Sequence, residues 1–303
     1  MYAVVFEEFG GPEVLTVREV PEPQAEAGQV RIKVHAAGVN PLDYKIRRGY
    51  MQGMFDVTFP ATPGLEVAGV VDQAGEGAGF AVGDEVVGWS ASGAYAEYAI
   101  VGNVTLKPAG VSWEQAVGVP VAGETAQRVL DLLGVKSGET ILIHGAAGAV
   151  GSVATQLAVA AGLTVIGTAS PRNHDFVRSL GATPVEYGDG LVDRVRAAAP
   201  QGVDAAFDTA GKGGLKESIE LIGGAERIVT IADFGAAELG VHVSPAGTAT
   251  PEEVRAALDA QLALVAEGKL SVRIAGTFGL AEAGKAQEIS EGGHAEGKLI
   301  VRP

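Results

Sequence analysis

A glycine-rich turn near the middle of the chain carries the clearest chemical signal in the sequence. Residues 145–151 (GAAGAVG) lie between an apolar run at 140–143 and a helical pattern that ends near residue 161. A helix N-terminus presents unpaired backbone N–H groups that bind a pyrophosphate, and small residues let the phosphate reach the backbone. We therefore expect a dinucleotide to be bound by Ala146, Ala147, Gly148, Ala149 and Val150, with alanine at the first position of the usual G-x-G-x-x-G pattern. A parallel-sheet core without a ligand is the alternative.

The residues after the next expected strand bear on which dinucleotide is bound. NAD-binding proteins usually place Asp or Glu about 20 residues beyond the glycine turn, where it accepts hydrogen bonds from the ribose hydroxyls. Here the strand expected at 163–168 is followed by Ser170 and Arg172, and the first acidic residue is Asp175. Ser170 can donate a hydrogen bond and Arg172 a charge-assisted one to a 2′-phosphate. This pattern predicts NADPH, unless Arg172 is only a surface residue that caps the turn.

The overall composition excludes several classes of function. The chain has 303 residues, which suggests two domains, and its net charge of −15 disfavours nucleic acids and anionic membranes as partners. It has no cysteine, which excludes disulfides and cysteine-ligated zinc. The first eleven residues (MYAVVFEEFGG) contain acids and no basic region, unlike a signal peptide, so we expect a cytoplasmic protein.

The elements that position these residues differ along the chain. Up to about residue 107, short apolar runs separated by glycine-containing turns predict a barrel-like β domain. A helical segment begins near Ser112, and then strands and helices alternate as in a doubly wound parallel sheet. Mixed strand and helix return in the last 35 residues or so. The expected strands of the sheet are 140–144, 163–168, 184–187, 203–208 and 227–231, with helices from 149, near 173–180, near 190–198, near 213–221 and from 251 to about 267.

Short motifs along nearly the whole chain occur in an order typical of one family. They are 36–43 (AAGVNPLD) with Arg47 and Gly49, 63–69 (PGLEVAG), 82–86 (VGDEV), 93–98 (GAYAEY), 121–126 (VAGETA), 144–151 (HGAAGAVG) and 293–298 (GHAEGK). In these motifs the chain resembles the zinc-free quinone oxidoreductase branch of the medium-chain dehydrogenase/reductase superfamily, which includes zeta-crystallin. The resemblance implies an α/β protein in which a GroES-like, β-rich catalytic domain (1–112 and 268–303) surrounds a Rossmann NADPH-binding domain with a doubly wound parallel sheet (113–267).

The resemblance also bears on the chemistry. Zinc-dependent relatives have a cysteine where Asn40 stands and a histidine where Leu65 stands, so no metal site is expected and no Lewis acid would polarise a substrate. This leaves hydride transfer from NADPH to electron-poor acceptors, namely quinones or α,β-unsaturated carbonyls such as enones and alkenals. A different class remains open, a non-enzymatic NADPH-binding structural or regulatory protein of the crystallin type.

Lys45 is the sharpest catalytic candidate. Enone-reducing relatives often have lysine at this position, and an ammonium there could donate hydrogen bonds to the nicotinamide ribose or to a carbonyl oxygen. The alternative is a solvated lysine in a basic patch with Arg47 and Arg48. Tyr44 is a second candidate, since it could replace a tyrosine that many quinone reductases have at the position of Lys45.

Three further residues match family positions near the cofactor. Asn40 and Thr125 resemble residues beside the nicotinamide, and Tyr187 resembles a tyrosine that reaches the 2′-phosphate. The alternatives are a turn residue before Pro41 for Asn40 and an ordinary helix residue for Thr125. Asp43 and Glu66 are expected to form structural ion pairs.

The remaining expectations concern the histidines and assembly. His35, His144, His242 and His294 follow no metal-ligand spacing, so structural roles are expected for them. From the family we expect a homodimer or homotetramer, joined through an edge strand at 241–243 or 227–231.

Overall fold

The computed structural model describes residues 1–244, 249–293 and 295–303, and the chain forms two units. The first unit contains Met1–Val121 and Arg255–Pro303, and the second contains Ala122–Val254. Residues 113–121 and 255–267 thus group with the first unit, although the resemblance implies a parallel-sheet domain of residues 113–267. In the described residues, no helix has both the length and the apolar composition needed to cross a bilayer.

A closed antiparallel barrel forms the centre of the first unit. Its strands are β3 (Val30–Val39), β4 (Glu66–Ala74), β5 (Glu85–Ser90) and β6 (Tyr98–Leu106), and β3 pairs with both β4 and β6. Buried Val30, Ile32 and Val34 alternate with Arg31 and Lys33, as expected for a strand with one face in the core. The barrel-like domain predicted from the sequence is confirmed.

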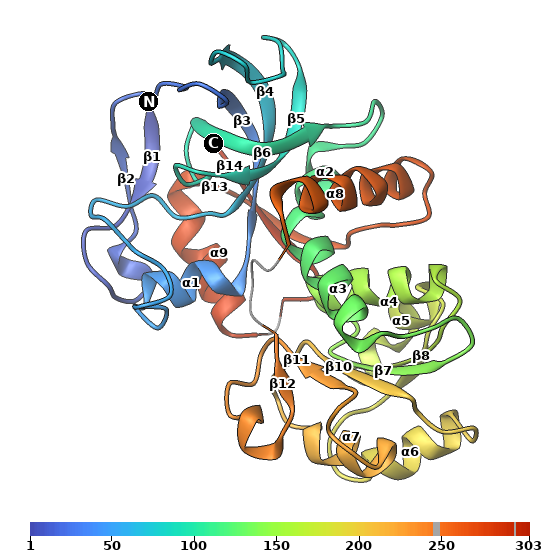
Figure 1. Cartoon of the computed structure of the whole chain (residues 1–303). Coiled ribbons are helices and arrows are strands. Elements are labelled where there is room, and N and C mark those ends of the chain that lie inside the picture. The colour runs from blue at the N-terminus through green and yellow to red at the C-terminus, as the bar shows by residue number, and fades with distance from the viewer. Residues whose placement is uncertain (245–248, 294) are drawn as a thin grey trace. The chain divides into compact units, whose positions relative to one another are not determined.

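Elements from the C-terminal part of the chain complete this unit (Figure 1). Strand β14 (Lys298–Arg302) pairs antiparallel with β3 and parallel with β13 (Ile274–Gly279). Helix α9 (Ala283–Glu291) packs on α1 (Pro41–Arg47). The pairing with β3 brings Lys298, at the start of β14, next to the residues that precede α1.

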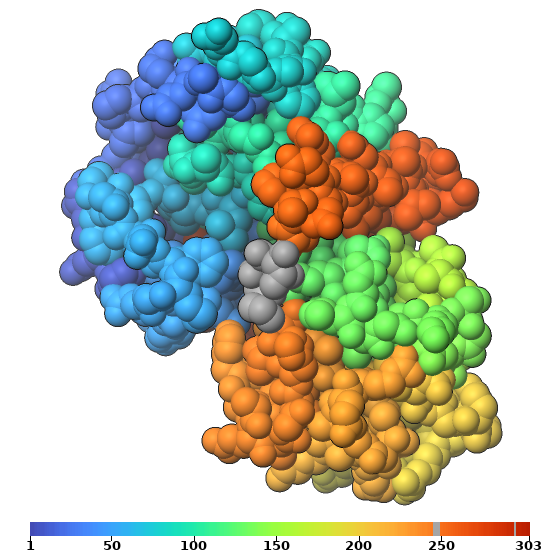
Figure 2. Space-filling view, viewed as in Figure 1, coloured from blue at the N-terminus to red at the C-terminus, as the bar shows by residue number. Residues whose placement is uncertain are grey.

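A short helix, most of a long helix and the N-terminal strands pack around the barrel. Strands β1 (Tyr2–Val5) and β2 (Thr16–Glu19) form their own antiparallel pair. Helix α2 is Trp113–Val117, and most of α8 (Pro251–Ala266) also belongs to this unit. In Figure 2 the orange atoms of α8 adjoin blue-green atoms of the barrel. Thr105 of β6 donates a hydrogen bond to Asp259 of α8.

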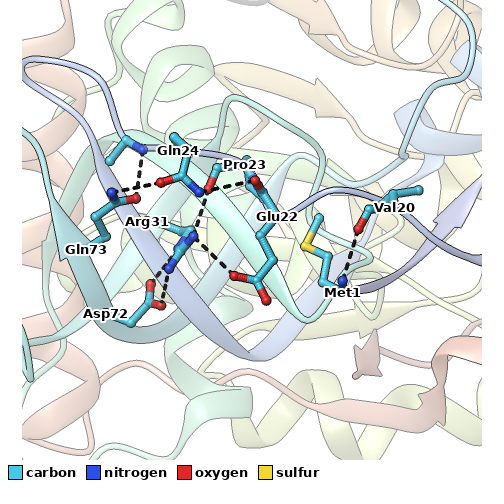
Figure 3. Close-up of polar contacts among 9 residues, drawn as sticks. Met1, Val20, Glu22, Pro23, Gln24, Arg31, Asp72 and Gln73 are labelled. Carbon is cyan, nitrogen blue, oxygen red and sulfur yellow. Dashed lines mark hydrogen bonds and ion pairs between the residues drawn. The ribbon is translucent and has the colours of Figure 1, made fainter.

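Side-chain hydrogen bonds hold the segment that links β2 to the barrel. The Arg31 guanidinium forms two hydrogen bonds with Asp72, at 3.0 and 2.8 Å, and a third with the carbonyl oxygen of Pro23 at 3.0 Å (Figure 3). Gln73 donates to the side chain of Gln24 at 3.1 Å. The linker is therefore fixed on the barrel surface.

The second unit is a six-stranded parallel sheet in the order β12-β11-β10-β7-β8-β9. Helices α4 and α5 cover one face, and α6 and α7 cover the other (Figure 1). The predicted doubly wound sheet is confirmed. Its elements are α3 (Pro120–Leu133, from Ala122 on), β7 (Thr140–His144), α4 (Ala149–Ala160), β8 (Thr164–Thr168), α5 (His174–Ser179), β9 (Thr183–Val185), α6 (Leu191–Ala198), β10 (Ala205–Asp208), α7 (Leu215–Ile222), β11 (Ile228–Thr230) and β12 (His242–Val243).

The order of the strands shows that only one of the two predicted edge segments lies at an edge of the sheet. Strand β12 lies at one end of the sheet, so residues 241–243 stay the proposed point of assembly. Strand β11 pairs with β10 on one side and β12 on the other. The prediction of an edge strand at 227–231 is therefore wrong, because its backbone hydrogen-bonding groups are already taken on both sides.

Candidate functional site

A buried charged cluster lies where β3, β4 and β14 of the first unit meet. The Lys298 ammonium donates a hydrogen bond of 2.7 Å to Asn40 Oδ1 and forms an ion pair with Glu66. Asn40 Nδ2 donates to Glu66 Oε1 at 2.9 Å, and the backbone N–H of Val121 donates to Glu66 Oε2 at 2.8 Å. Both charged side chains have no exposed surface. Burial of this ion pair is tolerated because several hydrogen bonds support it.

Glycine makes the close approach in this cluster feasible. A Cβ atom on Gly38 would lie 2.1 Å from Glu66 Oε1, so only glycine fits between β3 and the carboxylate. The predicted structural ion pair of Glu66 is thus present, with Lys298 as its partner.

Asp43, on α1, is linked to this cluster through the backbone of Asn40. Its Oδ2 accepts hydrogen bonds from the backbone N–H of Asn40 at 2.8 Å and from the hydroxyl of Tyr95 at 2.9 Å. The first of these caps the N-terminus of α1. Burial raises the pKa of the Asp43 carboxyl to about 7, against the opposing effects of these hydrogen bonds and of Lys298. The expected ion pair of Asp43 is replaced by a hydrogen bond to a tyrosine.

Helix α1 also carries both catalytic candidates. Lys45 and Tyr44 are half-buried. Burial lowers the pKa of the Lys45 ammonium and raises the pKa of the Tyr44 phenol, since the charged form of each is disfavoured away from water. Arg47 is fully buried, and both Arg47 and Arg48 bind Glu291, at 2.9 and 2.8 Å. In the basic patch proposed as the alternative for Lys45, both arginines are therefore held by one carboxylate of α9.

In the second unit, the glycine-rich turn connects β7 to α4. Gly145 has a φ of +74°, so the left-handed conformation falls one residue before Ala146. This explains why alanine is accepted at the first motif position. The backbone N–H of Ala146 donates to the carbonyl oxygen of Thr168 at 3.0 Å, and that of Gly145 donates to Thr168 Oγ1 at 3.1 Å. These bonds hold the turn beside the end of β8.

The twelve-residue helix α4 begins directly after Gly148. A Cβ on Gly151 would lie 2.2 Å from the carbonyl oxygen of Gly145, so glycine is required for the helix to pack on the turn. The N–H groups of its first turn precede the first intrahelical hydrogen bond and remain available to a phosphate. The turn therefore fits the pyrophosphate of a dinucleotide.

The residues proposed to bind the 2′-phosphate follow β8 and β9. Ser170 accepts a hydrogen bond from Asn173 at 3.2 Å, which leaves its own hydroxyl proton to donate. Arg172 and Tyr187 are exposed. Asp175, the first acid after β8, forms an ion pair of 2.6 Å with Arg178. A phosphate at this position would meet a serine and an arginine before any carboxylate.

The remaining predicted site residues have partners within their own units. The amide of Asn40 is engaged by Glu66 and Lys298, as described above, and Thr125 donates a weak hydrogen bond of 3.4 Å to Glu124. His144 is buried and bonds to Ser218 at 2.8 Å, which fits its expected structural role. His294 lies outside the described residues.

Sequence reasoning missed three residues. Lys298 binds Asn40 and Glu66, and Tyr95 binds Asp43. Both residues lie in motifs quoted above, 293–298 and 93–98, but the motifs do not show which side chains are buried or what they bind. Arg194 binds four carbonyl oxygens, those of residues 186–189, at 2.8–3.3 Å, and so fixes the loop that carries Tyr187. Its place on α6, after the loop, gave no indication of this.

The residues present do not fit a zinc ion. No group of three or more His, Asp or Glu side chains in the described ranges could hold a metal. Where zinc-dependent relatives have ligands, Asn40 and Leu65 offer an amide and a hydrocarbon, and the Lys298 ammonium already neutralises Glu66. A zinc ion at this point would meet a like charge instead of ligands.

Comparisons with known proteins agree with this architecture. Residues 26–165 match the family model described as "Alcohol dehydrogenase GroES-like domain", and residues 180–301 match "Zinc-binding dehydrogenase". The chain is 33% identical to human quinone oxidoreductase over an alignment of 322 positions, which covers 99% of this chain and 97% of the relative.

Solved structures give the same result. The quinone oxidoreductase from Coxiella burnetii has a TM-score of 0.86 and 33% identity, over 100% of this chain and 99% of that chain. The Escherichia coli quinone oxidoreductase complexed with NADPH has a TM-score of 0.89 and 27% identity, with both chains fully covered. The predicted family is thereby confirmed: the chain belongs to the quinone oxidoreductase branch of the medium-chain dehydrogenase/reductase superfamily.

Proposed function

We propose that this protein is an NADPH-dependent, zinc-independent reductase of quinones or α,β-unsaturated carbonyls. The observation that carries the proposal is the buried Lys298 ammonium, which binds Asn40 and Glu66. The resemblance implies that zinc-dependent relatives have metal ligands at the positions of Asn40 and Leu65. Without a Lewis acid, the acceptor must itself be electron-poor. Quinones and enones have this property, and the relatives in human, C. burnetii and E. coli are named quinone oxidoreductases.

Residues of the second unit would hold the phosphates of the cofactor. The first turn of α4 binds the pyrophosphate through backbone N–H groups from Ala149 to Gly151, next to Ala146, Ala147 and Gly148. Ser170, Arg172 and Tyr187 bind the 2′-phosphate, and Asn40, Lys45 and Thr125 contact the nicotinamide end. Bound NADPH supplies a hydride to the acceptor.

Lys45 and Tyr44 would act on the acceptor. The Lys45 ammonium donates hydrogen bonds, and its lowered pKa makes it a better proton donor than an ordinary lysine. It stabilises the negative charge that develops on the acceptor oxygen, while Tyr44 is a second proton source on the same helix.

The direct test is oxidation of NADPH by the purified protein with phenanthrenequinone, 1,4-naphthoquinone and 2-alkenals. We expect absorbance at the NADPH band to fall with at least one acceptor, since the residues for both binding and proton transfer are present. Binding of NADPH, measured by its fluorescence, without turnover of any acceptor would favour a non-enzymatic NADPH-binding protein instead.

The role of Lys45 leads to a second prediction. Lys45→Ala should lower kcat by roughly 10²-fold, because a positioned proton donor contributes about that factor. NADPH affinity should change less. Lys285→Ala is the matched control, since Lys285 is an exposed lysine of the same unit. Equal turnover of Lys45→Ala and wild type would show that Lys45 does not donate a proton and is only a solvated lysine of the basic patch.

Cofactor choice gives a third prediction. A hydrogen bond to a charged group contributes about 1.5–3 kcal/mol, so Arg172 alone can favour NADPH over NADH by about 10- to 100-fold. Arg172→Asp should abolish or reverse this preference, because it removes the contact and places a negative charge near the phosphate.

The preference is measured as the ratio of kcat/KM for NADPH and NADH with one acceptor. Arg196→Asp makes the same change of charge at an exposed ion pair on α6 and should leave the ratio unchanged. A wild-type protein that uses both cofactors equally well would contradict the assignment of Ser170 and Arg172.

A further inference from the structure

A cavity of about 250 Å³ lies within the first unit, beside α1. Ligand pockets in proteins usually combine apolar walls with a few polar groups that orient the ligand, and this cavity has both. Its apolar walls include Phe6, Ile46, Phe55, Val57 and Leu65, and its polar lining consists of Asp43, Asp56, Thr58, Thr62 and Ser90. The volume suits a small molecule of one or two rings.

The charged side chains of the cavity are all acidic. The described residues that line it include no Lys, Arg or His. Asp43 is buried, and its Oδ2 already accepts hydrogen bonds from Asn40 and Tyr95. Asp56 is exposed, and within the described part of the chain its carboxylate has no ion-pair or hydrogen-bond partner. Asp56 is therefore the carboxylate that a ligand in the cavity would meet.

The loop that carries Asp56 is anchored on both sides of this residue. Before it, the backbone N–H of Phe55 donates to the carbonyl oxygen of Met51 at 3.0 Å, and Met51 is buried. After it, the ring of Phe59 packs edge-on against the ring of Phe6, with 5.6 Å between the centroids. Phe6 and Phe55 belong to the cavity wall, so these contacts keep Asp56 beside the cavity.

Two hydroxyl groups of the lining can bind a ligand. The Ser90 hydroxyl donates to the carbonyl oxygen of Gly93 at 2.8 Å, so its proton is taken. The hydroxyls of Thr58 and Thr62 have no such partner among the residues that the structure describes. Each can donate a hydrogen bond to a carbonyl oxygen.

We propose that this cavity holds the quinone or enone acceptor and that Asp56 is a specificity-determining residue, which selects against acceptors that carry a negative charge. The inference rests on the proposed function. The Asp56 carboxylate repels an anionic substituent on the acceptor, and no basic side chain of the lining offsets this repulsion. A neutral acceptor packs its rings on Phe6 and Phe55 without repulsion and accepts hydrogen bonds from Thr58 and Thr62.

The test compares two quinones with the same ring system, one neutral (2-methyl-1,4-naphthoquinone) and one anionic (1,4-naphthoquinone-2-sulfonate). Their Kd values are measured by calorimetry at pH 7.5, without NADPH. The wild type should bind the sulfonate roughly five- to tenfold more weakly, because a like charge a few ångströms away has an effect of this order. Added salt should reduce the difference, since it screens exposed charges.

Asp56→Asn is the decisive variant, because it removes the charge with little change in volume. Its Kd for the sulfonate should fall by roughly the same five- to tenfold, while its Kd for the neutral quinone stays unchanged. Asp56→Lys should bind the sulfonate more tightly still. Glu76→Lys is the matched control: it makes the same change of charge at an exposed residue of the first unit that does not line the cavity, so the ratio of the two Kd values should stay as in the wild type.

The same ratio in wild type, Asp56→Asn and Asp56→Lys would overturn the proposal, as would an absence of binding of the neutral quinone to the wild type. An equal shift in Glu76→Lys would also contradict it, because the net charge of the protein would then determine the ratio. Circular dichroism of each variant checks that the chain still folds. Since the measurement needs no turnover, its result is independent of whether the protein oxidises NADPH, and failure of the proposed function is distinguishable from failure of this inference.

Discussion

The ion pair between Lys298 and Glu66 is the interaction on which the architecture of the first unit depends most. Together with Asn40 it joins three segments far apart in the sequence: the end of β3, the start of β4 and the start of β14. The same carboxylate accepts the N–H of Val121 at the start of α3. Two buried charges are unfavourable unless they are paired and hydrogen-bonded, and here each has more than one partner.

This cluster also determines where α1 begins. Asn40 is held by its amide, Pro41 starts the helix, and Asp43 caps it through the N–H of Asn40. Lys45 therefore stands on a helix whose first turn is fixed by buried polar contacts. Since a positioned donor is effective only when its helix is rigid, the network that stands in place of the metal ligands also supports the proposed chemistry.

Much of the fold could be read from the sequence, because hydrophobic periodicity and glycine positions are local signals. Strand 140–144 has the predicted bounds, and α4 begins at the predicted residue 149. The failures involve long-range pairing. Residues 227–231 have the composition of a strand, but only the sheet order shows that β11 is not an edge.

The site was less predictable than the fold, because much of it depends on contacts between residues far apart in the sequence. The glycine turn and the residues after β8 are contiguous, so their proposed roles follow from local patterns. The partner of Glu66, Lys298, is 232 positions away in the sequence. The motif that contains Lys298 (293–298) does not show that its side chain is buried or which carboxylate it binds. The pKa of Asp43 depends on burial among Tyr95, Glu66 and Lys298, which only the folded chain brings together.

The most direct test of the central claim is zinc content and turnover measured on one preparation. Metal analysis of the purified protein, followed by NADPH oxidation with 1,4-naphthoquinone before and after prolonged EDTA treatment, provides both. We predict far less than one zinc per chain and the same turnover before and after chelation, because Lys298 already supplies the positive charge beside Glu66. Stoichiometric zinc, with activity lost on its removal and restored on its return, would contradict the account.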